Sequence, residues 1–470
     1  MQQQNQDKKI LWHTLALMAF TSVWGFGNVI NGFSYYGGLR AALAWVLVFA
    51  LYFVPYALMV GELGSAFKNE GGGVSSWIHA TIGPRVAYYA GWTYWVVHMP
   101  YISQKPSATL IALSWSVFQD NRISSVNTTL LQIVCLVLFL FALWLASKGL
   151  GILKTISSVA GMCSFVMSIL FIIMMIAAPG ITKDPGLLDI NWSVKTFMPN
   201  FNAGFFLNLS ILVFAVGGCE RVSPYVNKMK DPAKDFSRGM IALAVMVCAC
   251  AVLGTIAMGM MFDSDNIPAD LLTNGAYYAF QMLGNYYGLG NLFVILFGLT
   301  NAICQFSVLI LSIDAPLRIL LESTDETYIP KAMFKQNKHG AYVTGHKLIL
   351  VIVAILIIVP AFGISSVDAL VQWLVKLNSV CMPLRYLWVF VAYVMLKKHM
   401  ERFPAEYQFT KSKTIGMIAG AWCFLFTGFA CVLGIYSDDP FQLVMNIVTP
   451  FVLLGLGLIM PAIAKRDTNR

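Results

Sequence analysis

The sequence has few charged residues. They make up 11% of its 470 residues, whereas soluble domains carry about 25%. Hydrophobic residues make up 58%, and the mean hydropathy is +0.71. The composition therefore excludes a soluble globular protein and predicts an integral membrane protein.

The chain also lacks the common motifs of enzymes and metal sites. The nine cysteines form no CxxC pair, so neither a metal centre nor a disulfide framework is indicated. There is no nucleotide-binding loop, no HExxH and no nucleophile elbow, which argues against a membrane enzyme. We expect no cofactor. The first apolar stretch follows Lys8 and Lys9 without a small-residue cleavage site, so we interpret it as a retained helix and not as a signal peptide.

Long apolar stretches recur along the whole chain. Each is about 20 residues or more, enough to cross a hydrocarbon core of about 30 Å as a helix. No loop between them is long enough for a soluble domain, so we predict one membrane domain over residues 1–470. The fold class is all-α, with about twelve transmembrane helices over 10–36, 41–64, 86–118, 128–147, 153–178, 203–224, 239–262, 288–318, 346–363, 370–396, 415–436 and 442–463.

Lysine and arginine are concentrated in alternate loops. With the N-terminus inside, the cytoplasmic segments hold 24 of the 31 basic residues, and the outer loops hold only Arg40, Arg122, Lys183 and Lys195. The positive-inside rule then places both termini in the cytoplasm, in a multi-pass protein of the cell's inner (cytoplasmic) membrane. The net charge of +9 follows from this topology, and we expect no nucleic acid partner.

Glycines interrupt two of the apolar stretches. The sixth contains "FAVGGCE", with Gly217 and Gly218, and the first contains "TSVWGFGNVINGF", with Gly25 and Gly27. The two breaks lie five spans apart, at corresponding positions of two five-helix halves. Paired broken helices indicate a substrate site at the membrane midplane, where freed N–H groups bind a carboxylate and freed carbonyls bind an ammonium. The alternative is that the glycines only permit close helix packing.

Four stretches together resemble the amino acid/polyamine/organocation (APC) superfamily. "FAVGGCE" followed by "KDPAKDFSRGM" is similar to its span-6 signature, and "ELGSAFKNEGGGVSSW" to its span-2 end and inner loop. "SIDAPLR" with "DETYIPKAMF" resembles its span-8 end, and "TSVWGFGN" looks most like the branch of glutamate/gamma-aminobutyrate antiporters. The resemblance, over about residues 10 to 400, implies a LeuT-like 5+5 inverted repeat with discontinuous helices 1 and 6. Its halves would span about 10–178 and 203–396, with accessory helices at about 415–463.

The resemblance and the breaks together predict the substrate-binding residues. The span-1 core reads Gly25, Phe26, Gly27 where the family usually has a Gly-Ser-Gly type, and span 5 lacks a lysine beyond Lys154. Many relatives carry a lysine in span 5. In this chain, another cation or a lysine elsewhere would take its place. The predicted substrate-binding residues are Thr21, Ser22, Gly25, Phe26, Gly27, Lys105, Phe214, Val216, Gly217, Gly218 and Asn301.

Three basic residues fall inside predicted spans, where a charge is costly and functional by default. Lys105 either pairs with a substrate carboxylate or exchanges a proton, or else forms a structural ion pair or reaches the outer surface. We expect the side chain of Lys376 to extend to the membrane–water interface. We expect Arg385 to pair with backbone carbonyls. His98 is interpreted as a packing residue, and Gln305, one turn from Asn301, as part of the cavity or of a helix contact.

Glu220 follows the second break and precedes a basic loop that includes Arg221, Lys228 and Lys230. We predict that it belongs to an inner gate of charge pairs, which Glu62 and Arg318 would complete. The alternative is an ordinary interfacial salt bridge.

These features predict a secondary transporter that moves amino acids, or exchanges an amino acid for its decarboxylated amine, by alternating access. The partners would be the small-molecule substrate, the lipid bilayer and, in some coupling schemes, a proton. The alternatives are a polyamine or cationic amine transporter, an ion channel and a non-transporting amino-acid receptor on the same fold. The sequence gives no indication of the oligomeric state.

Overall fold

The computed structural model describes residues 10–69, 73–148, 150–184, 186–322 and 324–468. The regular secondary structure of these residues is helical, and they contain no β-sheet, only the isolated bridges Ile10–Met229 and Gln336–Tyr342. Ten of the helical stretches are long and apolar enough to span a membrane. The prediction of an all-α membrane protein is confirmed.

The first half of the chain contains the following helices and short helical turns: α1 (Trp12–Val23), α2 (Phe26–Tyr35), α3 (Arg40–Val48), a π-helical turn (Phe49–Phe53), α4 (Val54–Ala66), α5 (Val74–Thr81), α6 (Pro84–Val96), α7 (His98–Phe118), a 3₁₀ turn (Arg122–Ser125), α8 (Thr128–Ala146), α9 (Leu150–Ala177), a 3₁₀ turn (Ala178–Gly180) and α10 (Val194–Phe197).

The second half continues with α11 (Ala203–Leu207), α12 (Leu209–Val216), a 3₁₀ segment (Cys219–Lys228), α13 (Pro232–Gly259), α14 (Leu271–Tyr286), α15 (Leu292–Glu322), a 3₁₀ turn (Lys331–Phe334), α16 (Val343–Ile358), a 3₁₀ turn (Val359–Phe362), α17 (Val367–Cys381), a 3₁₀ turn (Met382–Arg385), α18 (Tyr386–Lys398), α19 (Lys413–Gly434) and α20 (Pro440–Thr468).

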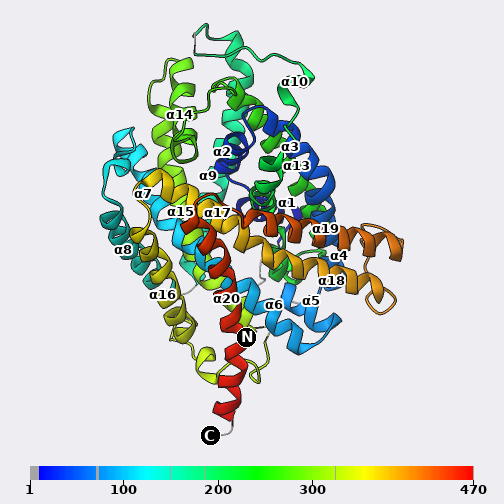
Figure 1. Cartoon of the computed structure of the whole chain (residues 1–470). Helices are drawn as coiled ribbons and strands as arrows, with labels where there is room; N and C mark the ends of the chain where they lie inside the picture. Colours follow the sequence, from blue (N-terminus) through cyan, green and yellow to red (C-terminus); the bar gives the residue numbers. More distant parts are fainter. Residues whose placement is uncertain (1–9, 70–72, 149, 185, 323, 469–470) are drawn as a thin grey trace, which may run out of the picture.

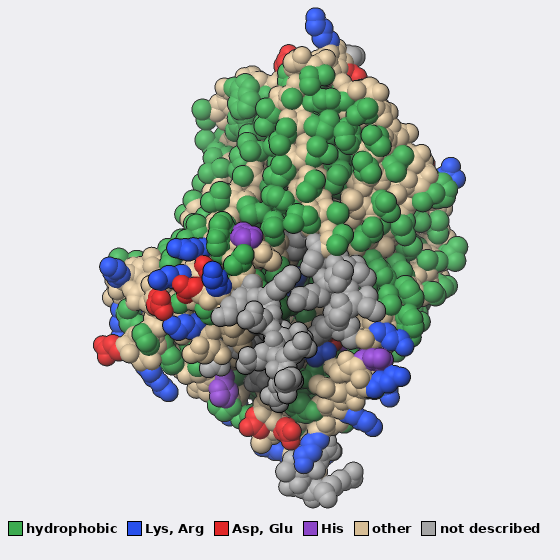
Figure 2. All heavy atoms as spheres, turned by 180° about the vertical axis from the view of Figure 1, so that it is seen from behind, with side chains coloured by type: hydrophobic (Ala, Val, Ile, Leu, Met, Phe, Trp, Pro, Cys, Tyr) green, Lys and Arg blue, Asp and Glu red, His purple; other side chains and the backbone are tan. Residues whose placement is uncertain are grey.

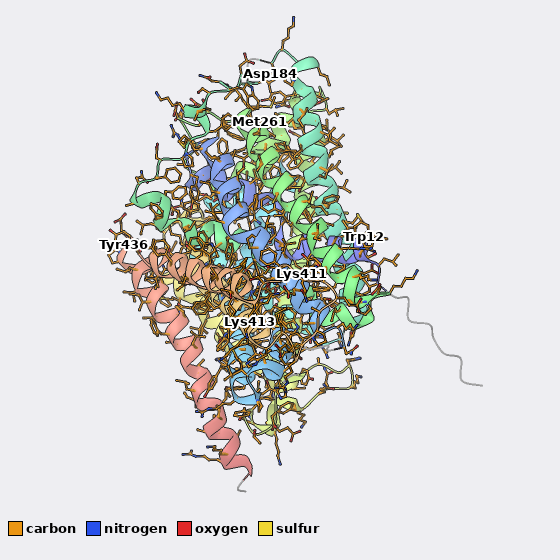
Figure 3. All side chains as sticks on the ribbon, turned by 90° about the vertical axis from the view of Figure 1, so that its right-hand side faces the viewer. Trp12, Asp184, Met261, Lys411, Lys413 and Tyr436 are labelled. Atoms are coloured by element: carbon orange, nitrogen blue, oxygen red, sulfur yellow. The ribbon has the colours of Figure 1, made fainter. Side chains whose placement is uncertain are left out.

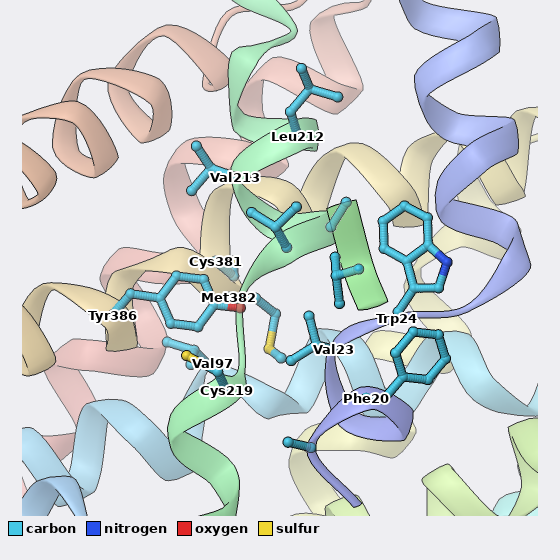
Figure 4. Packing of buried hydrophobic residues seen from close by; sticks show 14 of the residues in the cluster. Phe20, Val23, Trp24, Val97, Leu212, Val213, Cys219, Cys381, Met382 and Tyr386 are labelled. Atoms are coloured by element: carbon cyan, nitrogen blue, oxygen red, sulfur yellow. The ribbon is translucent and has the colours of Figure 1, made fainter. Parts of the chain in front are cut away.

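The first predicted span is broken in two. α1 ends at Val23, Trp24 and Gly25 are extended, and α2 begins at Phe26. The sixth is broken in the same way: α12 ends at Val216, Gly217 is extended, and Gly218 has a left-handed φ of 111°. Figure 4 shows the two breaks close to each other, with Trp24 at the first and Tyr386 and Cys219 beside the second.

In Figure 1, α10 and α14 lie at the end of the molecule opposite to the C-terminus. In Figure 3, Asp184 and Met261 lie at that same end, where the Leu188 N–H donates to the Met260 carbonyl at 2.8 Å. The distribution of side chains on the surface fits a membrane protein. The face in Figure 2 is hydrophobic over its upper part, whereas most of its charged side chains gather over its lower part. Hydrophobic residues that face outward, such as Val137, Val166 and Ile176, are more than half exposed, as expected of side chains in contact with lipid.

Three of the described helices lie outside the predicted spans: α5, α10 and α14. The longest of them is α14. α14 lies between the seventh and eighth predicted spans, in a segment that we expected to be a loop. It packs against α2 and α15, and therefore covers one end of the broken first helix.

Candidate functional site

A cavity of about 240 Å³ lies where the two helix breaks meet. Its wall comes from both pieces of the first span, from the 3₁₀ segment after α12, and from α7, α9, α12, α14, α15, α17 and α18. Val216 is fully buried and, like Gly218, is not part of the wall. The side chain of Thr21 lies outside the described residues. Eight of the predicted binding residues line the cavity: Ser22, Gly25, Phe26, Gly27, Lys105, Phe214, Gly217 and Asn301.

The N-terminus of α2 borders the cavity. Gly25 is its N-cap residue, and no side chain caps the helix there. The first N–H groups of a helix have no partner within the helix, and the helix dipole makes this end attractive to anions. A Cβ atom on Gly25 or Gly27 would meet no heavy atom within 4 Å, so both glycines leave room for a ligand.

Phe26 closes one side of the cavity with an aromatic cluster. Its ring centroid lies 4.7 Å from that of Phe171, 5.1 Å from that of Phe280 and 5.7 Å from that of Phe297. The apolar side chain at the centre of the span-1 core therefore packs against α9, α14 and α15.

Asn28 connects the two breaks. Its side-chain amide donates to the Ala215 carbonyl at 3.0 Å and to the Val23 carbonyl at 3.3 Å. Val23 is the last residue of α1, and Ala215 lies in the last turn of α12. One side chain thus occupies a freed carbonyl at each break and fixes the broken helices relative to each other.

Lys105 lies in the cavity wall and is 9% exposed. Its Nζ donates to Oε1 of Gln305 at 2.9 Å and lies 4.1 Å from the ring centroid of Tyr101. Within the described part of the chain, no carboxylate forms an ion pair with it. Neither a structural ion pair nor an extension to the outer surface therefore describes the contacts of Lys105.

A relay of hydrogen bonds continues from Lys105 along α15. Nε2 of Gln305 donates to Oδ1 of Asn301 at 3.2 Å, and Nδ2 of Asn301 donates to the Tyr277 hydroxyl at 2.9 Å. The Tyr277 ring stacks on Trp115, with centroids 5.3 Å apart. Since each amide uses its N–H as donor and its oxygen as acceptor, the relay fixes the orientation of both.

Arg221 is a second cation in the cavity wall. Its guanidinium carbon lies 5.6 Å from the Tyr101 ring centroid, and its Nε is buried without a hydrogen-bond partner. Of the described residues that line the cavity, none is an aspartate or a glutamate. Among the described residues of the cavity wall, two are therefore positively charged and none is negatively charged.

Glu220 points away from the cavity into a fully buried network. It accepts a short hydrogen bond from the Tyr56 hydroxyl, and its Oε1 lies 3.4 Å from Nε of Arg385. Nη1 of Arg385 contacts Nε2 of His98 at 2.6 Å, and Nδ1 of His98 contacts the Tyr94 carbonyl at 2.6 Å. The expectation that Arg385 pairs with backbone carbonyls is wrong, because its partners are a carboxylate and an imidazole.

Glu62 and Arg318 lie in two further clusters. Glu62 pairs with Lys397 and accepts from the Tyr393 hydroxyl and the Phe409 N–H. Arg318 donates to Asp314 at 2.6 Å. The contacts described for Glu62, Glu220 and Arg318 lie in three separate places: with Lys397, with Arg385 and with Asp314. Their role in gating stays a prediction.

Comparison with known proteins gives the family. Residues 10–459 match the amino acid permease family. The chain belongs to the amino acid permease family. It is 50% identical to the aspartate/glutamate permease AcaP of Lactococcus lactis subsp. cremoris (strain MG1363), over 98% of this chain and 97% of AcaP.

Two more distant relatives are also transporters by name. The inner membrane transporter YjeM of Escherichia coli (strain K12) is 25% identical, over 91% of this chain and 90% of YjeM. The glutamate/gamma-aminobutyrate antiporter of Lactococcus lactis subsp. lactis (strain IL1403) is 22% identical, over 86% of this chain and 81% of the antiporter. This amino acid permease is thus a multi-pass membrane transporter of small molecules and not an enzyme, as predicted.

The sequence reasoning missed part of the cavity of this permease. Arg221 was interpreted as part of the basic loop, although it follows the second break by only three residues. The predicted binding residues did not include Asn28, although it lies in the first broken span. Tyr101 and Tyr277 were also missed, because their sequence context does not distinguish them from aromatic packing residues.

Proposed function

We propose that this permease is a secondary transporter of acidic amino acids, aspartate and glutamate, that works by alternating access. The observation that carries the proposal is the charge of the cavity: Lys105 and Arg221 line it, and no described carboxylate does. The relative with 50% identity, named as an aspartate/glutamate permease, supports the same substrate class.

Each charged group of such a substrate has a suitable partner in the cavity. The α-carboxylate fits the uncapped N-terminus of α2 at Gly25. The α-ammonium fits freed carbonyls at the end of α1. The second carboxylate fits the cations, since opposite charges 4 Å apart attract by roughly 4 kcal/mol at an effective dielectric constant near 20.

The same charges argue against polyamine transport. A diamine would bring two more positive charges to a wall that already carries two, and like charges at these distances repel as strongly as opposite charges attract. Exchange for an amine that keeps a carboxylate, as in the antiporter relative's gamma-aminobutyrate, remains compatible with the cavity.

For the orientation, we propose the inner membrane of the cell, with both termini in the cytoplasm. The distribution of lysine and arginine among the loops supports this.

Uptake into proteoliposomes tests the substrate. Purified protein is reconstituted, and uptake of labelled L-aspartate is measured against a panel of unlabelled competitors. We expect competition by L-glutamate and none by L-arginine or putrescine. Absence of aspartate uptake, together with uptake of putrescine or a neutral amino acid, would overturn the proposal.

A further inference from the structure

The second cation of the cavity, Arg221, has no hydrogen-bonding partner among the described residues. Among the described residues, none forms a hydrogen bond or an ion pair with the guanidinium of Arg221, and its buried Nε has no partner. Its described side-chain contact is the face of the Tyr101 ring. A buried donor in this state is costly unless a ligand accepts its hydrogen bonds.

The local backbone separates Arg221 from the neighbouring carboxylate. Gly218 is left-handed, and the segment that follows is a 3₁₀ helix. Consecutive helical residues point in different directions: Glu220 turns to Arg385 and Tyr56, while Arg221 turns to the cavity. Glu220 is therefore occupied elsewhere and leaves Arg221 available.

Arg221 lies beside the first helix break. A Cβ atom built on Gly218 would lie 3.5 Å from Nε of Arg221 and 3.4 Å from the backbone oxygen of Ser22. Arg221 and Lys105 both lie over the Tyr101 ring, at 5.6 and 4.1 Å from its centroid, so the two cations are less than about 10 Å apart. The guanidinium therefore lies within the span of one small ligand that touches both breaks.

The two cations differ in what they can still bind. Lys105 already donates to Gln305, and an ammonium is a point charge without directional preference for a carboxylate. Arg221 offers a planar fork of donors that matches both oxygens of a carboxylate. An amide oxygen, as in asparagine or glutamine, offers one acceptor and places an NH₂ group against the other donors.

We propose that Arg221 is the residue that selects acidic over neutral amino acids, by binding the side-chain carboxylate of the substrate. This inference rests on the proposed function, since it concerns the same cavity. The α-carboxylate is left to the N-terminus of α2, so the two carboxylates of one substrate occupy the two helix breaks. Loss of a hydrogen bond to a charged group weakens binding by about ten- to hundredfold.

The test compares Arg221→Gln and Arg221→Lys with the parent protein in proteoliposomes. KM for L-aspartate and inhibition constants for L-asparagine and L-glutamine are measured in each. We expect Arg221→Gln to raise KM for aspartate at least tenfold and to improve inhibition by asparagine relative to aspartate. Arg221→Lys should fall in between, because it keeps the charge and loses the fork.

Two further variants serve as comparisons. Arg85→Gln removes an exposed charge outside the cavity wall and should leave the selectivity of the parent. Lys105→Gln removes the other cavity charge and should change the aspartate-to-asparagine ratio less than Arg221→Gln does. If Arg221→Gln does not insert into the membrane, Arg221→Lys alone tests the assignment. This variant keeps the positive charge, and we expect it to discriminate less between aspartate and asparagine than the parent does.

The outcomes separate this inference from the proposed function. If the parent does not transport aspartate, the proposed function fails. If the parent does so and Arg221→Gln and Arg221→Lys keep its KM and selectivity within about twofold, the assignment of Arg221 fails. Equal changes in Arg221→Gln and Lys105→Gln would show an effect of overall cavity charge and would also overturn the assignment.

Discussion

Glycine occurs at the two helix breaks for different physical reasons. At Gly217, a Cβ atom would lie 2.0 Å from the Tyr386 ring, so the backbone and the ring approach each other too closely for any side chain. At Gly218, the φ of 111° disfavours any residue with a Cβ. At Gly25 a Cβ atom would enter open space, so there the absence of a side chain provides volume for a ligand.

This difference predicts opposite behaviour of two alanine variants. Gly217→Ala forces the Tyr386 ring to move, and overpacking of this kind costs about 1–3 kcal/mol. We expect it to lower the thermal midpoint of the purified protein and to reduce transport. Gly25→Ala should keep the midpoint. The larger substitution Gly25→Leu should abolish transport without loss of stability. A normal uptake rate in Gly25→Leu would contradict the placement of the substrate at this break.

The buried pair Glu220–Arg385 makes a second prediction at the residue scale. Removal of one partner from a fully buried pair leaves the other charge uncompensated, which costs about 3–5 kcal/mol. Glu220→Gln should therefore lower the thermal midpoint strongly.

An exposed ion pair provides the matched control for Glu220. Glu406 binds Lys68 at 2.8 Å on the surface, where this contact lowers the pKa of the Glu406 carboxyl. Glu406→Gln should leave the thermal midpoint unchanged because the surrounding water screens the pair. Equal midpoints for the two variants would show that Glu220 is not essential to the buried network.

At the scale of helices, the lengths of the apolar runs predicted most elements, and the glycines predicted both breaks. α14 was missed because "LLTNGAYYAFQMLGNY" is short and mixes polar with aromatic residues. The partners of the buried charges could not be predicted either. Lys105 and Gln305 are 200 residues apart, and Glu62 and Lys397 are 335 apart, so only the packing of the helices brings them together.

The link that Asn28 makes between the broken helices can be tested by a substitution of the same shape. An aspartate at this position cannot donate to the carbonyls of Val23 and Ala215, and each buried acceptor left unpaired costs about 1–3 kcal/mol. Asn28→Asp should lower both the thermal midpoint and the transport rate. Asn31 lines the same cavity, and no described contact shows its side chain in a hydrogen bond. Asn31→Asp should therefore keep the midpoint, and equal shifts would argue against the link.

At the scale of the whole molecule, the positive charge of the loops predicts the orientation in the membrane. Single cysteines are placed at two exposed positions, Lys335 and Asp265, in a background without accessible native cysteines. In intact cells, an impermeant thiol reagent should label Asp265→Cys and not Lys335→Cys. The reverse pattern would invert the topology. The division into halves of about 10–178 and 203–396 stays a prediction at this scale.

The charge of the cavity, with two cations and no carboxylate among its described lining residues, predicts that this permease transports acidic amino acids. Counterflow tests it most directly: proteoliposomes loaded with one unlabelled compound are diluted into a trace of labelled L-aspartate, and accumulation of the label is followed. We predict accumulation with internal L-aspartate or L-glutamate and none with putrescine, agmatine or L-arginine. Accumulation with the internal amines and none with the acidic amino acids would contradict the claim.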